Sequence, residues 1–275
     1  MHTVNANGAN IPAIGLGTWT LKGDECADLV QAAIETGYRH IDTAAMYDNE
    51  RDVGRGIARS GLARDDLFVT TKVWHSNLAA KDFRRSAEQS LDRLGLEQVD
   101  LLLIHWPSPT VPLAETIAAL NAARDDGLTR NIGVSNFPTG LLSEAVSLSK
   151  HPLAVNQVEY HPNLDQTKVL TACRAAGTAM VSYCPLGRGL DILRQKPIAD
   201  AAAAHGRSPG QIVLRWHVQQ QGVIAIPRTT KRERLAENLD IDGFQLTDAE
   251  MAAISAMRSA NNRICDFEFS PKWDS

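Results

Sequence analysis

The chain lacks the features that mark disulfide-rich, zinc-binding and membrane proteins. It has four cysteines in 275 residues, and no two of them form a CxxC pair: Cys26, Cys173, Cys184 and Cys265. This scarcity predicts free, mostly buried thiols and no paired-cysteine zinc site, and none of the four is expected to act as a nucleophile. No apolar run approaches the roughly 20 residues of a membrane span. Residues 1–5 show neither the basic nor the apolar region of a signal peptide, so we expect a cytoplasmic protein.

Strong charge of either sign is also missing. Lys and Arg number 28 and Asp and Glu number 32, which gives a net charge of −4. This balance argues against a nucleic acid or an anionic membrane as partner. With 44% hydrophobic and 22% charged residues, the composition is that of an ordinary soluble protein. Since one barrel or one doubly wound sheet takes roughly 250 residues, we expect a single domain over residues 1–275.

Strand-like and helix-like segments alternate along the chain about every 30 residues. The expected strands are residues 14–18, 38–42, 67–73, 99–105, 131–135, 154–158, 179–183 and 223–226. Helical periodicity follows seven of them, at residues 26–34, 50–60, 83–94, 113–126, 139–148, 167–176 and 231–238, and helical segments also follow residue 183. Such alternation predicts a parallel (β/α)8 TIM barrel. A doubly wound sheet is the alternative, but no glycine fingerprint follows the first strand.

Three additions to the eight units are expected. An Asn-Gly turn predicts a short β-hairpin over residues 4–11. Two extra helices are each expected to open on a capping box, one at Ser208 and one at Thr247. Residues 261–275 show no period and are expected to form an irregular tail.

Polar residues stand where three neighbouring strands are expected to end. Asp42 ends the second strand, Lys72 lies in the third, and His105 ends the fourth, while Tyr47 follows Asp42 by five residues. The C-terminal mouth of a barrel carries its chemistry, so these side chains can converge. A lysine in an apolar strand costs several kcal/mol unless it is paired, which makes Asp42 its natural partner. A purely structural ion pair is the alternative reading.

The chemistry of this set favours protonation of a carbonyl oxygen. An ammonium beside a phenol favours the phenolate, so Tyr47 next to Lys72 is expected to be a tuned general acid. The imidazole of His105 can hold the carbonyl oxygen toward that phenol. A metal-dependent barrel hydrolase is a competing class, but it needs several converging ligands and His105 has no second strand-end histidine. We therefore expect no metal, and the set still lacks a hydride source.

Three stretches of the chain resemble the aldo-keto reductase superfamily. They are Gly-Tyr-Arg-His-Ile-Asp-Thr-Ala at 37–44 with Tyr47, Glu50 and Gly54 in register, Ile-Gly-Val-Ser-Asn-Phe at 132–137, and Ile-Pro-Arg-Thr at 226–229 with Arg234, Glu237 and Asn238. The resemblance covers nearly the whole chain and implies a (β/α)8 barrel that reduces aldehydes or ketones with NADPH. It implies that Asp42, Tyr47, Lys72 and His105 form the catalytic tetrad. Channel-associated relatives keep a tetrad-like set, so an NADPH-binding regulatory subunit is the alternative.

The resemblance also implies where the nicotinamide half of the cofactor binds. Its carboxamide is expected to be held by polar residues that end strands five and six, namely Ser135, Asn136 and Gln157. Its ring is expected to stack on Tyr183. Phosphate contacts are expected from the loop that follows, namely Pro185, Leu186, Gly187 and Arg188. Thr18 and Asp42 are also expected to touch the cofactor.

A basic stretch near the C-terminus predicts the other end of the cofactor. Residues 228–234 carry four cations and one anion. Because cations at a helix N-terminus oppose its dipole, a bound phosphate is expected between them. The resemblance assigns the 2′-phosphate to Arg228, Thr229 and Arg234, with Thr230 beside them, and the adenine to Glu237 and Asn238. We therefore expect NADPH to be preferred over NADH.

The expected substrate pocket combines apolar walls with a polar focus. Its lining residues are expected to be Trp19, Tyr47, Trp74, His105 and Trp106. The segment at residues 108–111 and the tail are both short, which favours an open mouth and small polar carbonyl compounds. The His-Trp-Pro-Ser-Pro segment at residues 105–109 is similar to that of bacterial 2,5-diketo-D-gluconate reductases. This implies 2,5-diketo-D-gluconate, methylglyoxal or simple aldehydes as substrates, and a monomer.

Overall fold

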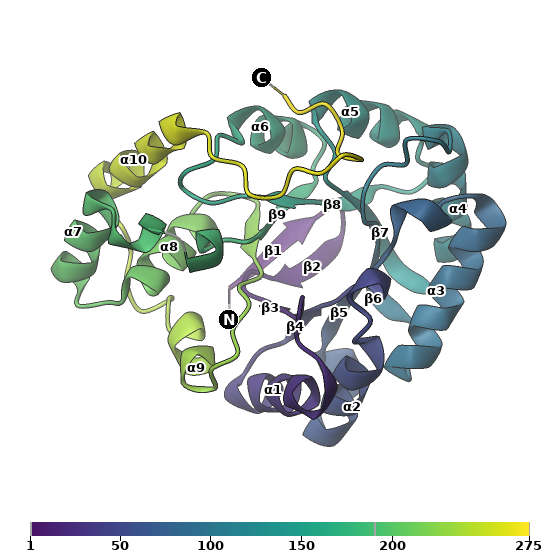
Figure 1. Cartoon of the computed structure of the whole chain (residues 1–275), viewed down its shortest axis with the longest axis horizontal. Coiled ribbons are helices and arrows are strands. Elements are labelled where there is room, and N and C mark those ends of the chain that lie inside the picture. Colours follow the sequence, from purple (N-terminus) through teal and green to yellow (C-terminus); the bar gives the residue numbers. More distant parts are fainter. Residues whose placement is uncertain (1, 190, 275) are drawn as a thin grey trace.

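Within residues 2–189 and 191–274, which the computed structural model describes, eight parallel strands curl into one sheet surrounded by helices (Figure 1). Met1, Leu190 and Ser275 lie outside these ranges. The strands are β3 (Leu16–Gly17), β4 (His40–Asp42), β5 (Phe68–Val73), β6 (Val99–Ile104), β7 (Thr129–Ser135), β8 (Leu153–Glu159), β9 (Ala179–Tyr183) and β10 (Val223–Ala225). A parallel bridge between Ile14 and Ala225 joins the two ends of the sheet. The predicted (β/α)8 barrel is confirmed.

The helices lie outside the strands (Figure 1). They are α1 (Gly23–Thr36), α2 (Glu50–Ser60), α3 (Ala80–Leu94), α4 (Leu113–Asp125), α5 (Thr139–Leu148), α6 (Thr167–Ala175), α7 (Lys196–His205), α8 (Pro209–Val218), α9 (Glu233–Leu239) and α10 (Asp248–Ala256). In α1 the expected apolar face is buried, and the helix ends at Gly37, whose φ of 120° suits glycine alone. None of the helices in the described ranges is long and apolar enough to cross a membrane.

The register between neighbouring strands brings the predicted polar residues to one end of the barrel. Asp42 pairs with Thr70, two residues before Lys72, and Lys72 pairs with Leu103, two residues before His105. Both β5 and β6 are buried along their whole length, because helices cover the outside and side chains fill the inside. The three strands therefore end together at the C-terminal mouth.

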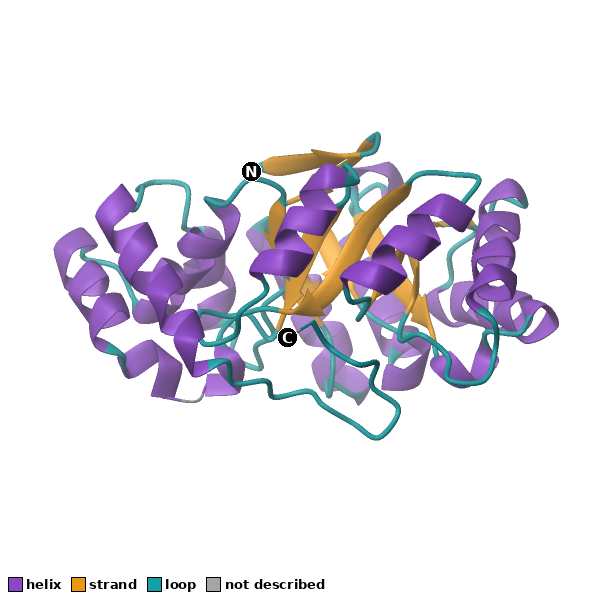
Figure 2. Ribbon diagram, turned by 90° about the horizontal axis from the view of Figure 1, so that it is seen from above, coloured by secondary structure: helices purple, strands orange, loops and turns teal. Residues whose placement is uncertain are grey.

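The predicted hairpin covers the opposite end of the barrel (Figure 2). It consists of the antiparallel strands β1 (Thr3–Ala6) and β2 (Ala9–Pro12). Its turn residues Asn7 and Gly8 have φ values of 47° and 90°, as a tight two-residue hairpin turn requires. The amide of Asn7 donates a hydrogen bond of 2.8 Å to the carbonyl oxygen of Leu153, which fixes the hairpin to the start of β8.

Both predicted capping boxes are present, but one of the two extra helices is not the one expected. Ser208 and Thr247 cap α8 and α10 as predicted. Helix α8 packs against β10 and buries most of its residues, so it belongs to the barrel. Helix α7 packs on α8 and α10 at the edge of the molecule and buries only Ile198 and Ala201 (Figure 1). The inserted helix before β10 is therefore α7, whose few buried residues leave little apolar pattern to detect.

Candidate active site

Asp42 and Lys72 form a buried ion pair at the ends of β4 and β5. The Lys72 Nζ lies 2.6 Å from Asp42 Oδ1, and the two side chains are 0% and 1% exposed. The same ammonium donates to the carbonyl oxygen of Thr43 at 2.7 Å, and the second carboxylate oxygen of Asp42 accepts from Gln157 Nε2 at 2.7 Å. Burial lowers the pKa of Lys72, while Asp42 and the buried Glu50 act to raise it. The ammonium is thus oriented by several fixed oxygens.

Tyr47 ends the short 3-10 turn Ala45–Tyr47 that follows β4. Its hydroxyl lies 3.4 Å from Lys72 Nζ. Burial and the nearby carboxylate of Asp42 raise the pKa of Tyr47 well above its ordinary value. The expected shift toward the phenolate is therefore wrong, because burial and the carboxylate of Asp42 both favour the protonated phenol. Tyr47 consequently keeps its proton at neutral pH.

His105 follows β6 and faces Tyr47. The two rings meet edge to face with centroids 5.6 Å apart, and Trp74 also packs edge to face on the imidazole at 5.0 Å. Burial and the positive charge of Lys72 lower the pKa of His105 well below its ordinary value. Its Nδ1 is buried without a hydrogen-bond partner within the described residues. His105 is thus a neutral imidazole that can donate one hydrogen bond.

Polar side chains from β7, β8 and β9 meet next to the tetrad. Ser135 Oγ donates to the carbonyl oxygen of Gln157 at 2.8 Å, and Asn136 Nδ2 donates to that of His105 at 3.0 Å. The hydroxyl of Tyr183 donates to Asn136 Oδ1 at 2.8 Å. The structure therefore brings together four of the predicted nicotinamide contacts, and Gln157 connects them directly to Asp42.

The loop after β9 reaches across the mouth to the residues that follow β3. The guanidinium of Arg188 lies 4.5 Å from the ring centroid of Trp19, which is 40% exposed. Thr18 next to it is buried and donates its hydroxyl hydrogen to the carbonyl oxygen of Asp42 at 3.0 Å. The rest of the predicted phosphate loop, Pro185, Leu186 and Gly187, lies between β9 and Arg188. Loop and Trp19 together border the site on the side of β3.

The basic stretch follows β10 and runs into the first turn of α9, which begins at Glu233. Arg228, Thr230 and Arg234 are exposed, whereas Thr229 is buried. Within the described part of the chain, neither Arg228 nor Arg234 has a side-chain hydrogen bond or ion pair. Two free guanidinium groups on one short stretch fit an anion.

The two predicted adenine contacts lie on α9, beside this stretch. Asn238 is buried, and the carboxylate of Glu237 is half-buried and accepts a hydrogen bond from the hydroxyl of Ser208 at the start of α8. Glu237 is therefore held in place by the neighbouring helix.

The C-terminal tail adds aromatic residues that the sequence reasoning missed. Trp106 is buried at 4% exposure beneath the rings of Phe267, Phe269 and Trp273, and Phe269 also packs on Trp74 at 5.5 Å. The tail runs across the barrel mouth (Figure 1). The mouth is therefore narrower on this side than the short tail suggests. In the sequence, the alternating aromatic residues of Phe267-Glu-Phe269 are the feature that could have indicated these contacts.

A carboxylate at the end of β8 anchors this tail and was also missed. Glu159 is fully buried and accepts hydrogen bonds from the backbone N–H groups of Ile264 at 2.7 Å and Cys265 at 2.6 Å. Asp274 fixes the far end of the tail, because it accepts from the backbone N–H of Thr139 at 2.9 Å. The tail is thus tied to the barrel at two points.

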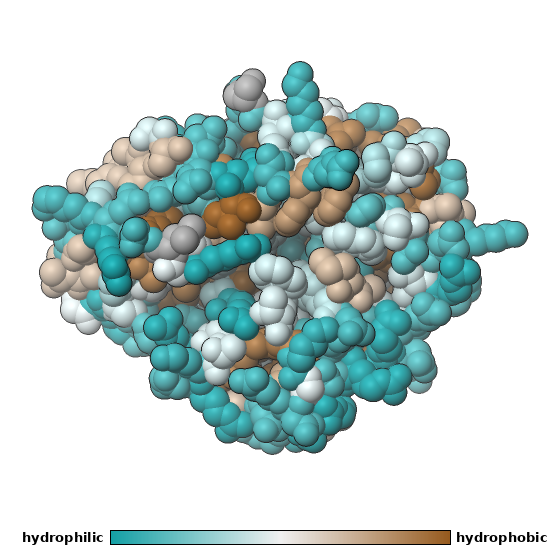
Figure 3. Space-filling view, in the orientation of Figure 1, coloured by the Kyte–Doolittle hydropathy of each residue, from teal (hydrophilic) through white to brown (hydrophobic). Residues whose placement is uncertain are grey.

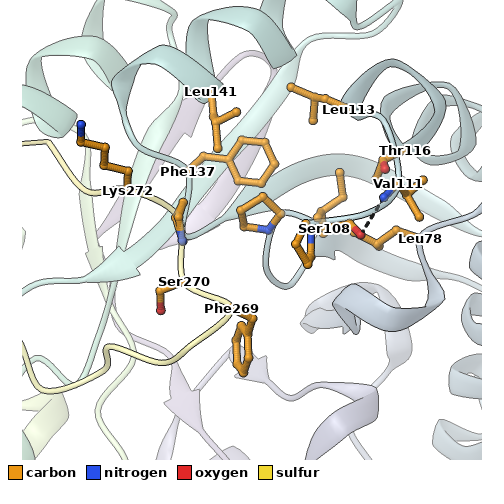
Figure 4. A pocket seen from close by; sticks show the side chains of 14 residues that line it. Leu78, Ser108, Val111, Leu113, Thr116, Phe137, Leu141, Phe269, Ser270 and Lys272 are labelled. Carbon is orange, nitrogen blue, oxygen red and sulfur yellow. Dashed lines mark hydrogen bonds between the residues drawn. The ribbon is translucent and has the colours of Figure 1, made fainter.

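A cavity of about 300 Å³ lies between the tail and the loop after β6 (Figure 4). Phe137, Leu141 and Phe269 give it apolar walls, and Ser108, whose Oγ accepts from Val111 N at 3.0 Å, lies at its edge. On the same face, apolar side chains gather near the centre within a largely hydrophilic surround (Figure 3). Among the residues that the structure describes, no group of three or more His, Cys, Asp or Glu could hold a metal.

Comparisons with known proteins point in one direction. A family model described as the aldo/keto reductase family matches residues 13–259. Methylglyoxal reductase DkgB of Escherichia coli O157:H7 is 42% identical over 268 residues, which are 96% of this chain and 99% of that protein. A solved structure provisionally described as a 2,5-diketo-D-gluconic acid reductase B is 44% identical, with a TM-score of 0.97 over 100% of this chain and 98% of that one. An aldo-keto reductase of Bombyx mori in complex with NADP is 37% identical, with a TM-score of 0.90 over 96% and 95%.

The buried ion pair predicts that removing one partner destabilises the protein more than removing both. Lys72→Met leaves the carboxylate of Asp42 buried without its counter-charge and should lower the free energy of unfolding by about 3–5 kcal/mol. The double variant Asp42→Asn/Lys72→Met buries no charge and should regain most of that loss. Urea unfolding of the wild type, both single variants and the double variant measures the coupling. A double variant no more stable than Lys72→Met would contradict the prediction.

The exposed pair Lys196–Asp200 provides the control for this cycle. Its side chains are 84% and 62% exposed at an N–O distance of 2.7 Å. Solvent screens such a pair, so the effects of Lys196→Met and Asp200→Asn should simply add.

Proposed function

The chain belongs to the aldo/keto reductase family, and from that membership we propose how its own residues reduce a carbonyl group. It is an NADP-dependent oxidoreductase, as its relatives and the NADP-bound neighbour indicate. One observation carries the proposed roles: the ammonium of Lys72 lies between the carboxylate of Asp42 and the hydroxyl of Tyr47, at 2.6 and 3.4 Å. The regulatory-subunit and metal-hydrolase alternatives have no support among these relatives.

Tyr47 is the proposed proton donor. The hydride that reduces the carbonyl carbon would come from NADPH when this cofactor is bound. The carbonyl oxygen then gains negative charge, and Tyr47 gives it a proton. The raised pKa of Tyr47 keeps the proton in place until that charge develops. The Lys72 ammonium, oriented by Asp42, stabilises the phenolate that is left.

His105 is proposed to orient the substrate. Because its imidazole is neutral, its single N–H can donate to the carbonyl oxygen without competing as an acid with Tyr47. The edge-to-face contacts with Tyr47 and Trp74 hold the ring in place. We propose that Trp19, Tyr47, Trp74, His105 and Trp106 line the substrate pocket, and that Phe269 joins them.

The polar cluster at β7 to β9 suits the nicotinamide. Ser135, Asn136 and Gln157 offer hydroxyl and amide groups that match both the N–H and C=O of a carboxamide. Tyr183 supplies the ring for stacking, and Thr18 and Asp42 lie beside this cluster. Since Gln157 Nε2 also donates to Asp42, residues that would hold the carboxamide are connected directly to the tetrad.

The phosphates are proposed to bind along two basic segments. One is the loop Pro185, Leu186, Gly187 and Arg188, and the other is Arg228, Thr229, Thr230 and Arg234, with Glu237 and Asn238 toward the adenine. The uncompensated guanidinium groups of Arg228 and Arg234 support a 2′-phosphate at the second segment.

Small polar carbonyl compounds are the proposed substrates. The similarity to methylglyoxal reductase DkgB and to the 2,5-diketo-D-gluconic acid reductase B structure supports methylglyoxal, 2,5-diketo-D-gluconate and simple aldehydes. We further propose a single domain over residues 1–275, a monomer, and a cytoplasmic location. Four free cysteines suit a reducing compartment.

The substrate proposal predicts an order of catalytic efficiency. With NADPH, kcat/KM for methylglyoxal and 2,5-diketo-D-gluconate should exceed that for bulky aromatic ketones by about tenfold or more, because the tail narrows the mouth over Trp106. Absorbance of NADPH at 340 nm follows each reaction. Equal or better turnover of the aromatic ketones would contradict the assignment, and no turnover with any carbonyl would contradict the enzymatic function itself.

Tyr47→Phe tests the proton donor. The variant should bind NADPH as the wild type does, yet lose at least about 100-fold in kcat for methylglyoxal, in line with the usual contribution of a general acid. Tyr160→Phe is the matched control, because its hydroxyl is bonded to Gln220 and lies away from the tetrad. Wild-type turnover in Tyr47→Phe would rule out this role.

Arg234→Met tests the phosphate site. Loss of a charge-assisted contact to the 2′-phosphate should weaken NADPH binding by about 10- to 100-fold and leave NADH binding nearly unchanged. Arg232→Met removes the same charge two residues away, where the guanidinium instead donates to the carbonyl oxygen of Asp28, and should have a much smaller effect. Fluorescence titration gives both dissociation constants. Equal weakening of NADPH and NADH in Arg234→Met would reject the assignment.

A further inference from the structure

Two of the four cysteines meet where the C-terminal tail passes the end of β9. Cys184 directly follows Tyr183, the last residue of β9, and Tyr183 pairs in register with Glu159, the last residue of β8. The carboxylate of Glu159 accepts a hydrogen bond of 2.6 Å from the backbone N–H of Cys265. Cysteines from two distant parts of the sequence are therefore fixed at the ends of neighbouring strands, close enough for each thiol to shift the pKa of the other.

The two thiols have different surroundings. Cys265 is buried at 5% exposure, whereas Cys184 is partly exposed. The Nη2 atom of Arg188 lies 3.1 Å from Cys265 Sγ, and the positive charge of the same guanidinium lowers the pKa of Cys184. The hydrogen bond from Cys265 and the charge of Arg188 lower the pKa of Cys184 to about 7, while the hydrogen bond and burial raise that of Cys265. Cys184, which is the more exposed thiol and the one with the lowered pKa, is therefore the one that we expect to react as thiolate.

The other two cysteines have no such partner. Cys26 and Cys173 are buried in α1 and α6, and burial raises the pKa of each to about 12. They act as internal references in the same molecule, because a buried thiol is inert toward oxidants.

We propose that Cys184 and Cys265 form a peroxide-sensitive dithiol, in which Cys184 attacks the oxidant and Cys265 then closes a disulfide. The sulfur of Cys184 bonds to one oxygen of a hydroperoxide, the O–O bond breaks, and the other oxygen leaves as water or an alcohol. Cys184 becomes a sulfenic acid. The sulfur of Cys265 next attacks that of Cys184, the S–O bond breaks, and the oxygen leaves as water. Two electrons pass from the thiol pair to the hydroperoxide.

The position of the pair gives the disulfide a structural consequence. It would join the tail, which carries Phe267 and Phe269 to Trp106, to the loop that carries Arg188 to Trp19. Both segments border the mouth of the barrel. No cysteine was expected to be a nucleophile from the sequence, since the partner of Cys184 lies in a tail without any periodic pattern.

Mass spectrometry of the wild-type protein tests the proposal. After treatment with a small excess of hydrogen peroxide and alkylation of free thiols, trypsin should release residues 175–188 joined to residues 264–272 by a disulfide. Dithiothreitol should separate the two peptides. Cys26 and Cys173 should be recovered in the reduced form from the same sample. No joined peptide, or oxidation of Cys184 no faster than that of Cys26 and Cys173, would overturn the proposal.

Two variants assign the order of attack. In Cys265→Ser the sulfenic acid of Cys184 has no partner and should be trapped by dimedone, whereas in Cys184→Ser the remaining Cys265 should react at least about tenfold more slowly. The reverse preference would overturn the assignment.

Arginine variants test the activating charge without removing either thiol. Arg188→Met should slow alkylation of Cys184 at pH 7. Arg194→Met, which removes an exposed guanidinium from the same segment, should not. Equal rates in the two variants would remove Arg188 from the proposal.

Discussion

The active site depends on one constraint, which is that a lysine ammonium inside the barrel must be neutralised. Lys72 has no exposed surface, and an unpaired charge there would be expelled or deprotonated. Asp42 can neutralise it only because β4 and β5 lie side by side in register. Gln157 on β8 then saturates the second carboxylate oxygen from across the barrel. The ion pair with all of its partners therefore forms only when β4, β5 and β8 lie in the same barrel.

The same desolvation sets the protonation states of the neighbouring groups. Burial disfavours every charged form, so it raises the pKa of Tyr47 and lowers that of His105. A protonated phenol and a neutral imidazole are the forms that a proton donor and a hydrogen-bond donor need. Burial lowers the pKa of Lys72 as well, but there Asp42 and Glu50 oppose the shift and stabilise the ammonium. Desolvation thus favours the uncharged forms of Tyr47 and His105, and two carboxylates oppose its effect at Lys72.

The sequence was sufficient for the barrel and for the strand-end residues, but not for the segments that cover the mouth. Helix α2 was predicted with its observed bounds, because hydrophobic periodicity and a following glycine encode them locally. The hydrogen bond that Glu159 accepts from Ile264 has no such local pattern in the sequence, because its donor is a backbone N–H, which every residue except proline carries. The direction of the pKa shift of Tyr47 also required the structure, because the burial of a phenol in a loop cannot be read from its neighbours in sequence.

These two kinds of segment divide the work of the site. Asp42, Lys72 and His105 lie in or directly after strands that are buried on both faces, so their geometry tolerates little change. The tail is held by backbone hydrogen bonds to Glu159 and Asp274 and by a few aromatic contacts, so its side chains can vary while the attachment remains. With the proposed roles, the residues that select the carbonyl compound therefore belong mainly to the tail and loops, and most of those that reduce it belong to the barrel. The cysteine pair lies where the tail meets the barrel, at the ends of β8 and β9. A disulfide between Cys184 and Cys265 would therefore connect the tail covalently to the end of a barrel strand.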